Sequence, residues 1–199
     1  GVFGEPLIAP DRLTVASLAK RQGYRTAAIG KWHLGWDWPI DEGDKGLFRN
    51  YKEADRTAPE ADKAAWKKVF AQKIPGGPTT RGFDTYFGTD VPNWPPYCFI
   101  ENDRTIGIPS VPLPAEFFRN HLASTPGPAL PDWKLEAILP ALTERACAFI
   151  TEATDKPEPW MLYLPLTTPH TPLAVNAEWK GKSGLNNAAA DLIMETDAA

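Results

Sequence analysis

The chain has 199 residues, 43% of them hydrophobic and 23% charged, with a formal net charge of −4 at pH 7. This length is enough to bury a sizeable core, so one domain is the default expectation, and no apolar run reaches the length of a bilayer span. The negative net charge excludes a general attraction to nucleic acid or to another polyanion, so an anionic ligand must be held by local charges.

Residues 1–35 predict a helix, a turn and a strand. Thr14 suits the N-cap of a helix over residues 15–22, and Gly23 suits the left-handed position that ends it. The apolar run that follows, up to Ile29, predicts a buried strand. The residues expected on the apolar face of the helix are Val15, Leu18 and Ala19.

A lysine and a histidine follow this strand directly, in Gly30-Lys31-Trp32-His33-Leu34-Gly35. Ligands of open α/β sheets bind beyond the carboxyl ends of the strands, which is where Lys31 and His33 are expected. The glycines at either end allow the backbone to approach a ligand closely. Taken alone, Lys31 is better interpreted as a surface lysine and His33 as a histidine packed near Trp32; the full pattern of residues 23–35 favours a catalytic role for both.

Residues 36–131 are rich in proline and aromatic residues and have few periodic runs. A short amphipathic helix is expected over residues 61–71 and a strand within residues 80–88. The rest of this region is interpreted as a long functional loop that walls a cleft. Four of its aromatic residues could stack on a sugar or aryl ring, although packing in the core or in loops is favoured for most of them: Trp36, Trp38, Trp94 and Tyr97.

Residues 132–199 return to regular structure. Helical spacing runs from Leu135 to Ile150, with Pro140 starting or kinking a helix, and residues 160–166 predict a strand buried on both faces. His170 follows this strand between two prolines, where it could also be part of a rigid turn. Two parallel strands joined through a helix would bring Lys31, His33 and His170 to the same edge of the sheet.

The remaining polar residues carry weaker signals. His121 is treated as a loop residue, and Lys180 and Lys182 as solvated side chains. A helix is expected to begin near Asp191, with Glu195 and Asp197 as charges at its start. Cys98 and Cys147 do not have metal-site spacing, and a disulfide between them can be neither argued nor excluded.

Several motifs, in order and at similar spacing, resemble the type I sulfatases, the formylglycine-dependent branch of the alkaline-phosphatase superfamily. The first is G-Y-x-T-x-x-I-G-K-W-H-L-G over residues 23–35, and the second is the G-F-D-x-x-x-G element over residues 82–88. The third is P-W-x-L-Y followed by P-H-x-P over residues 159–172, and the fourth is D-x-x-M-E-x-D over residues 191–197.

The resemblance implies an α/β sandwich of the alkaline-phosphatase type with a largely parallel central sheet, incomplete in this chain. Residues 1–199 would then form a partial catalytic domain: a helix–strand unit with the Lys/His loop (1–35), a cleft wall (36–131), and a helix–strand unit with the His loop and a helix start (132–199). By the same resemblance, Lys31 contacts the sulfate and the nucleophile, His33 the formylglycine hydroxyl, and His170 the sulfate or the bridging oxygen.

The family's nucleophile motif, C-x-P-S-R or S-x-P-S-R, does not occur in this sequence, and neither do its calcium-binding aspartates. The chain is therefore expected to be an internal piece of a sulfatase, inactive alone, with the formylglycine and the calcium ligands outside it. The resemblance implies hydrolysis of sulfate monoesters of a sulfated small molecule or carbohydrate, and a periplasmic, secreted or lysosomal-type compartment.

Two alternatives remain open at this point. One is a phosphonate or phosphate ester hydrolase of the same superfamily, because such an enzyme shares much of this site. The other is a non-catalytic fragment that binds an anion weakly.

Overall fold

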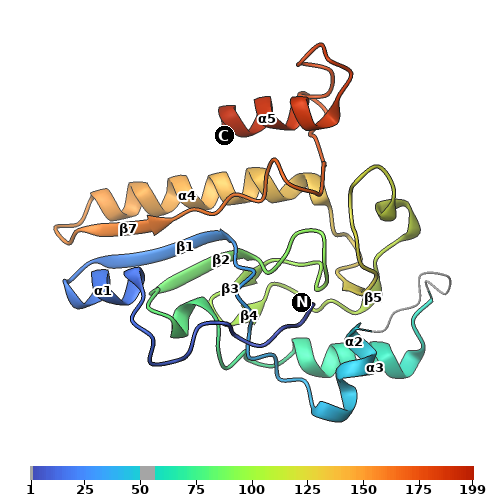
Figure 1. Ribbon diagram of the computed structural model, residues 1–199, viewed down its shortest axis with the longest axis horizontal. Coiled ribbons are helices and arrows are strands. Elements are labelled where there is room, and N and C mark those ends of the chain that lie inside the picture. The colour runs from blue at the N-terminus through green and yellow to red at the C-terminus, as the bar shows by residue number, and fades with distance from the viewer. Residues whose placement is uncertain (1, 50–56) are drawn as a thin grey trace.

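The computed structural model describes residues 2–49 and 57–199. A five-stranded sheet lies at its centre, in the order β4-β3-β2-β1-β7 (Figure 1). Strand β1 (Arg25–Lys31) pairs in parallel with β2 (Thr85–Thr89) on one side and with β7 (Trp160–Tyr163) on the other. The short strands β3 (Ile100–Glu101) and β4 (Arg104–Thr105) continue the sheet in antiparallel order. The expectation of an α/β fold with a largely parallel sheet is thus confirmed.

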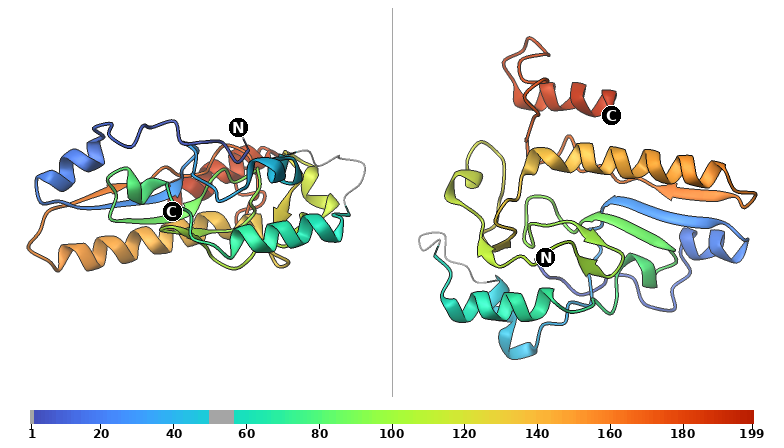
Figure 2. Two further views of the ribbon diagram at one scale, coloured as in Figure 1. Left: turned by 90° about the horizontal axis from the view of Figure 1, so that it is seen from below. Right: turned by 180° about the vertical axis from the view of Figure 1, so that it is seen from behind.

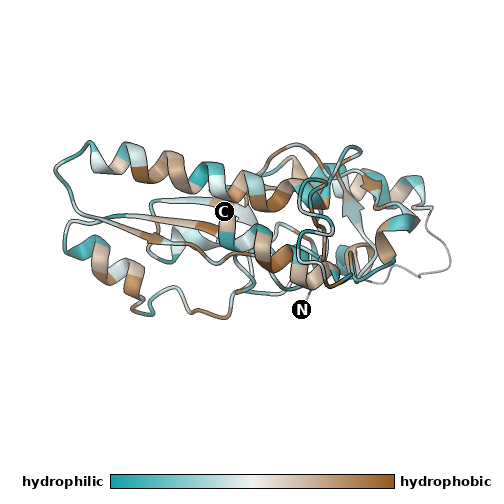
Figure 3. Cartoon of the chain, turned by 90° about the horizontal axis from the view of Figure 1, so that it is seen from above, coloured by the Kyte–Doolittle hydropathy of each residue, from teal (hydrophilic) through white to brown (hydrophobic). Residues whose placement is uncertain are grey.

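Helices cover both faces of this sheet. Helix α1 (Val15–Arg21) packs against β1 on one face, and α4 (Ile138–Thr154) packs against β1 and β2 on the other. Figures 2 and 3 show the strands between these two helices. Since α4 lies between β2 and β7 in the chain, the predicted strand–helix–strand connection is confirmed.

The other elements lie outside this sandwich. The remaining helices are α2 (Lys45–Arg49), α3 (Glu60–Phe70) and α5 (Ala188–Ala198). Strands β5 (Val111–Pro112) and β6 (Pro128–Ala129) form a separate two-stranded sheet. Short 3-10 turns are η1 (Glu42–Asp44), η2 (Pro78–Thr80), η3 (Ala115–Phe118) and η4 (Leu135–Ala137).

Apolar side chains gather in three clusters. The first lies between the sheet and α4 and contains Ile29, Phe87, Leu142 and Phe149. The second lies on the α1 side, around Trp32, Trp36 and Tyr86. The third joins the N-terminal segment to α2 and α3 and contains Phe3, Phe48 and Trp66. The aromatic residues of the proline-rich region therefore build core as well as surface.

The start of α1 is predicted correctly, but its buried face is not. The Thr14 side chain accepts a hydrogen bond from the Ser17 backbone N–H at 3.0 Å, as an N-cap should. Val15 and Leu18 are nevertheless exposed, and Ala16 is the residue of α1 buried against the sheet. In so short a helix the spacing of apolar residues does not decide which side meets the sheet; tertiary packing does.

Strand β7 is also less buried than expected. Its residues are half-buried or exposed, and Tyr163 is 43% exposed. The prediction of a strand buried on both faces is therefore wrong for this chain. The reason is its position at the edge of the sheet that the described residues form, with β1 on one side only.

Gly30 marks a close contact at the end of β1, and its substitution tests the importance of that contact. It has a φ of +139°, and a Cβ there would overlap the carbonyl oxygen of Pro165. We expect Gly30→Ala to lower the free energy of unfolding of the complete protein by about 2 kcal/mol or more, since it combines backbone strain with a clash against backbone. Chemical denaturation measures this loss.

Gly23 provides the matched control. It also has a positive φ, +82°, but a Cβ there would meet nothing within 4 Å. Gly23→Ala should therefore cost only the left-handed conformation, about 1–2 kcal/mol. Equal losses of unfolding free energy for the two variants would show that the close contact between β1 and Pro165 does not add to the cost of a Cβ at Gly30.

Candidate active site

The three parallel strands end at the same edge of the sheet, and each is followed by polar residues. Lys31 ends β1 and His33 follows it, Asp90 and Asn93 follow β2, and His170 lies in the loop after β7. Carboxyl ends of parallel strands are where α/β sheets bind ligands. These loops therefore define the candidate site.

Lys31 is the last residue of β1, and its backbone is fixed on both sides. It pairs with Thr89 of β2, and its N–H donates to the carbonyl of Pro165 at 2.9 Å. Its side chain is partly buried, and this desolvation lowers the pKa of the ammonium group, while the negative charge of Asp90 acts in the opposite direction. The lysine is thus held as a partly desolvated cation at the sheet edge.

Trp32 anchors the loop between the lysine and the histidine. Its side chain is buried, its Nε1 donates to the Gly35 carbonyl at 2.9 Å, and its backbone N–H donates to Thr89 at 3.0 Å. His33, by contrast, is exposed and has a left-handed backbone, with φ of 53°. The anchored tryptophan therefore leaves the neighbouring imidazole presented at the surface.

The segment after β2 supports His33. The His33 backbone N–H donates to the carbonyl of Asp90 at 3.1 Å, and its ring meets Trp94 edge to face, with 5.3 Å between ring centroids. Asp90 itself is only 4% exposed. Burial raises the pKa of its carboxyl to about 6, although the charge of Lys31 acts to lower it.

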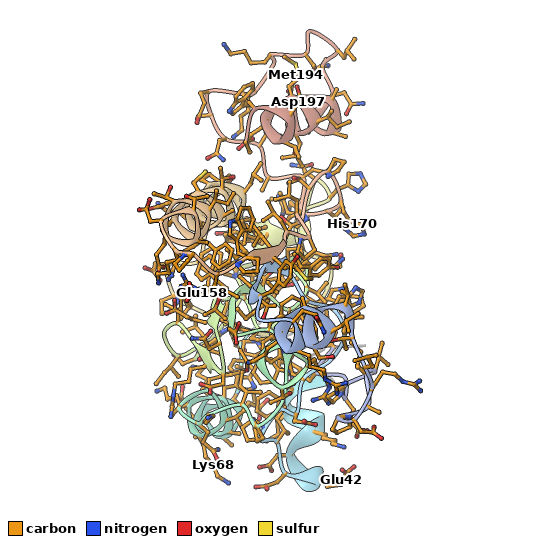
Figure 4. The ribbon with its side chains drawn as sticks, turned by 90° about the vertical axis from the view of Figure 1, so that its left-hand side faces the viewer. Glu42, Lys68, Glu158, His170, Met194 and Asp197 are labelled. Atoms are coloured by element: carbon orange, nitrogen blue, oxygen red, sulfur yellow. The ribbon has the colours of Figure 1, made fainter. Side chains whose placement is uncertain are left out.

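His170 lies at the surface in the loop between β7 and α5. Figure 4 shows it below α5, whose Met194 and Asp197 are labelled above it. Its Nδ1 lies 2.8 Å from the carbonyl oxygen and 3.0 Å from the hydroxyl of Thr171. Since both contacts involve Nδ1, Nε2 is the ring nitrogen left for a ligand.

The structure joins the loops that carry the predicted residues Lys31, His33 and His170 at one edge of the sheet. The Lys31 N–H donates to Pro165 in the segment that leads to His170, and the segment after β2 bonds to both histidine loops, through His33 and Thr171. Partial desolvation and then the charge of Lys31 lower the pKa of His33. The three basic side chains at the ends of β1 and β7 are called the cationic cluster below.

Two acidic residues near the C-terminus accept hydrogen bonds from backbone N–H groups of the segment before α5. Glu195 is buried in the second half of α5 and accepts hydrogen bonds from the Asn176 backbone N–H at 3.0 Å and the Asn176 side chain at 2.6 Å. Asp197 also lies in the second half of α5, so neither residue is a helix-start charge, which corrects that prediction. Asp191 accepts from the backbone N–H groups of Gly181 and Ser183, and these bonds lower the pKa of its carboxyl.

Both cysteines are free thiols. Cys98 is fully buried, and this burial raises its pKa strongly, whereas Cys147 is exposed on α4. Within residues 2–49 and 57–199, no group of three or more His, Cys, Asp or Glu side chains is placed to hold a metal ion. None of the helices in those ranges is both long and apolar enough to cross a membrane.

Sequence reasoning missed the residues after β2. Asp90 and Asn93 are both buried and contact the two histidine loops, through His33 and Thr171 respectively. The signal was present, because Asp90 to Trp94 directly follow a predicted strand, as Lys31 and His170 do. Of the aromatic residues proposed to stack on a ligand, Trp36 and Tyr97 are buried in the core, and Trp94 contacts His33.

A family model and the relatives found by comparison with known proteins agree on one family. A family model described as Sulfatase matches residues 3–199. The chain is 28% identical over 185 residues to arylsulfatase G of Mus musculus, an alignment that covers 83% of this chain and 27% of the relative. It is 24% identical over 226 residues to an N-acetylgalactosamine-6-O-sulfatase of Bacteroides thetaiotaomicron, covering 97% of this chain and 39% of the relative.

A solved structure shares the fold. It comes from work on glycosaminoglycan metabolism by Bacteroides thetaiotaomicron and superposes with a TM-score of 0.66 at 23% identity, covering 98% of this chain and 41% of that one. The chain therefore spans well under half the length of the relatives it matches, and within that span it follows their fold.

Proposed function

The chain belongs to the sulfatase family, and from this premise we propose that the complete protein hydrolyses sulfate monoesters at the loops that carry Lys31, His33 and His170. The proposal depends chiefly on one observation: the loops after the parallel strands β1, β2 and β7 leave the same edge of the sheet and are joined by hydrogen bonds, which supports a shared site for the basic side chains of Lys31, His33 and His170. Such a cluster, in a chain whose net charge is −4, suits a tetrahedral anion.

Lys31 is proposed to stabilise the sulfuryl oxygens. Negative charge on these oxygens must be neutralised by groups already in place, and a partly desolvated ammonium interacts more strongly than one in water. Its fixed backbone, bonded to Pro165 and paired with Thr89, holds this charge in position. Desolvation lowers the pKa of this ammonium group, and the negative charge of Asp90 partly opposes that shift.

His33 and His170 are proposed to move protons. The pKa of His33 is lowered, so its imidazole is neutral near pH 7 and can accept a proton as a base. His170 holds Nδ1 against Thr171, which leaves Nε2 to donate a hydrogen bond or a proton to the departing alcohol oxygen. Each role is of the size expected for general acid–base catalysis, about 10²–10⁴-fold in rate.

The formylglycine expected of the family would supply a hydrated aldehyde, one hydroxyl attacking sulfur and the other allowing release of sulfate. Within this chain neither cysteine suits that role, because Cys98 is buried and Cys147 lies on the exposed side of α4. The described residues also form no group that fits a calcium ion. Both groups are therefore proposed to come from outside this sequence, and the roles above involve only this chain's residues.

The relatives suggest the class of substrate. One of them is named an N-acetylgalactosamine-6-O-sulfatase, and the other an arylsulfatase. We propose a sulfated carbohydrate as the natural substrate, with a simple aryl sulfate as a convenient test compound. A phosphate or phosphonate ester hydrolase remains the nearest rival, because a cationic cluster also suits those anions.

Sulfatase and phosphatase activity can be separated with two esters that share one leaving group. The complete protein, expressed from its full reading frame with calcium present, should hydrolyse 4-nitrophenyl sulfate with a higher kcat/KM than 4-nitrophenyl phosphate. Residues 1–199 alone should give no turnover, because no nucleophile motif lies in them. A preference for the phosphate ester would favour the rival, and robust turnover by residues 1–199 would contradict the missing-nucleophile argument.

A further inference from the structure

A polar cavity lies next to the His170 loop. Its volume is about 710 Å³, within the range of small-molecule sites. We call it the amide pocket, because three asparagines are among its lining residues. The polar residues that line it are Asn120, His121, Ser124, Thr171, Asn186 and Asn187.

The amide pocket is at the same end of the sheet as the candidate site. Thr171, one of its lining residues, directly follows His170 and contacts its Nδ1. Figure 1 shows the segment after β5 and the segment leading into α5 at this end of the molecule. The amide pocket therefore adjoins the loop that carries His170.

Hydrogen bonds between separate segments fix the pocket wall. Asn93, only 5% exposed, donates from Nδ2 to the Ser124 hydroxyl at 2.7 Å and to the Thr171 hydroxyl at 3.2 Å. The Leu173 N–H donates to the His121 carbonyl at 3.0 Å. Three stretches of chain, after β2, after η3 and after β7, are thus joined around the cavity, so the pocket is largely pre-formed.

The chemistry of the lining indicates what it binds. None of the described residues that line it is an Asp, Glu, Lys or Arg. Amides and hydroxyls both donate and accept hydrogen bonds, which is what a neutral, hydroxyl-rich ligand requires. Phe118 and Leu173 add apolar surface for the carbon face of such a ligand. This lining suits a sugar better than a second anion or a charged peptide.

We infer that the amide pocket binds the sugar unit that carries the sulfate ester, with His170 at the boundary between sugar and sulfate. The position of His170 between sugar and sulfate rests on the proposed function. The inference deepens that function, because it assigns recognition of the sugar to His121, Asn120 and Asn186 on the pocket rim. All three have a left-handed backbone, with φ between 54° and 58° for Asn120 and His121 and 47° for Asn186.

Because these three residues have a positive φ, glycine can replace each of them without backbone strain and removes only the side chain. We expect His121→Gly and Asn186→Gly in the complete protein each to lower the ratio of kcat/KM for N-acetylgalactosamine 6-sulfate to that for 4-nitrophenyl sulfate by about fivefold or more, as the loss of one or more hydrogen bonds predicts. Using a ratio cancels any general loss of active enzyme.

Asn102→Gly is the matched control. Asn102 is also an asparagine with a positive φ, 54°, but it lies in the turn between β3 and β4, outside the pocket. Its substitution should leave the ratio unchanged. If the His121 and Asn186 variants behave like this control, the sugar does not touch the pocket and the inference is wrong.

A binding measurement separates the inference from the proposed function. N-acetylgalactosamine without sulfate should give saturation-transfer NMR signals with the wild-type complete protein, and weaker ones with the His121 and Asn186 variants. Absence of sugar binding to the wild type would overturn the inference even if sulfate esters were cleaved. Sugar binding that the variants weaken, in a protein that cleaves no sulfate ester, would support the pocket and overturn the proposed function.

Discussion

Replacing Lys31 with alanine is expected to reduce kcat of the complete protein on 4-nitrophenyl sulfate by about 10²–10³-fold. The ammonium is partly buried at the end of β1, so its charge acts through a medium less polar than water. Its backbone is fixed to Pro165 and Thr89, so the charge is held at the end of β1. Steady-state kinetics over a range of substrate concentrations measure the loss and show whether it falls on kcat or KM.

Lys182→Ala is a suitable control for this experiment. Lys182 is exposed in the loop before α5, and its substitution removes the same charge without touching the cationic cluster. The control should retain the wild-type rate within a small factor. A near-normal kcat for the Lys31 variant would overturn the role assigned to it.

The second large effect concerns His33. His33→Ala should lower kcat/KM by about 10²–10⁴-fold, the usual contribution of a general base. The structure also gives the direction of its pH dependence. Since desolvation and the charges of Lys31 and His170 lower the pKa of His33, its neutral form persists below the ordinary histidine value of about 6.5. Activity limited by this base should therefore fall only at more acidic pH.

Lys31→Met tests the cause of that shift. Removing the lysine charge stabilises the imidazolium form, so the pKa of His33 should rise in this variant. Asp90 also titrates, at about pH 6, so the measurement should follow the imidazole signals of His33 by NMR rather than activity alone. A pKa of His33 that stays constant or falls in Lys31→Met would show that the two side chains do not interact.

The parts of the fold that depend on local patterns could be predicted from the sequence. The N-cap at Thr14, the strand before Lys31 and the helix–strand unit before His170 all have strong local signals. What failed depends on partners far along the chain. Val15 and Leu18 are exposed because α1 meets the sheet through Ala16, and Tyr163 is exposed because β7 lies at the edge of the described sheet.

The candidate site shows the same division. Lys31, His33 and His170 stand in motifs that a reader can find, whereas Asp90 and Asn93 are recognised only through their contacts. Asn93 reaches Thr171, 78 positions away, by one hydrogen bond. No local pattern reports such a bond, although the rule that ligands meet strand ends, applied to β2 as well as to β1 and β7, would have indicated this segment.

The central claim is that one tetrahedral anion is held by Lys31, His33 and His170 together. A crystal structure of the complete protein with bound sulfate tests this most directly. The claim predicts one sulfate with Lys31 Nζ and a ring nitrogen of each histidine within hydrogen-bond reach, about 2.7–3.2 Å, directly or with the nucleophile's hydroxyl between sulfate and His33. A sulfate bound elsewhere, or one that His170 cannot reach, would contradict it.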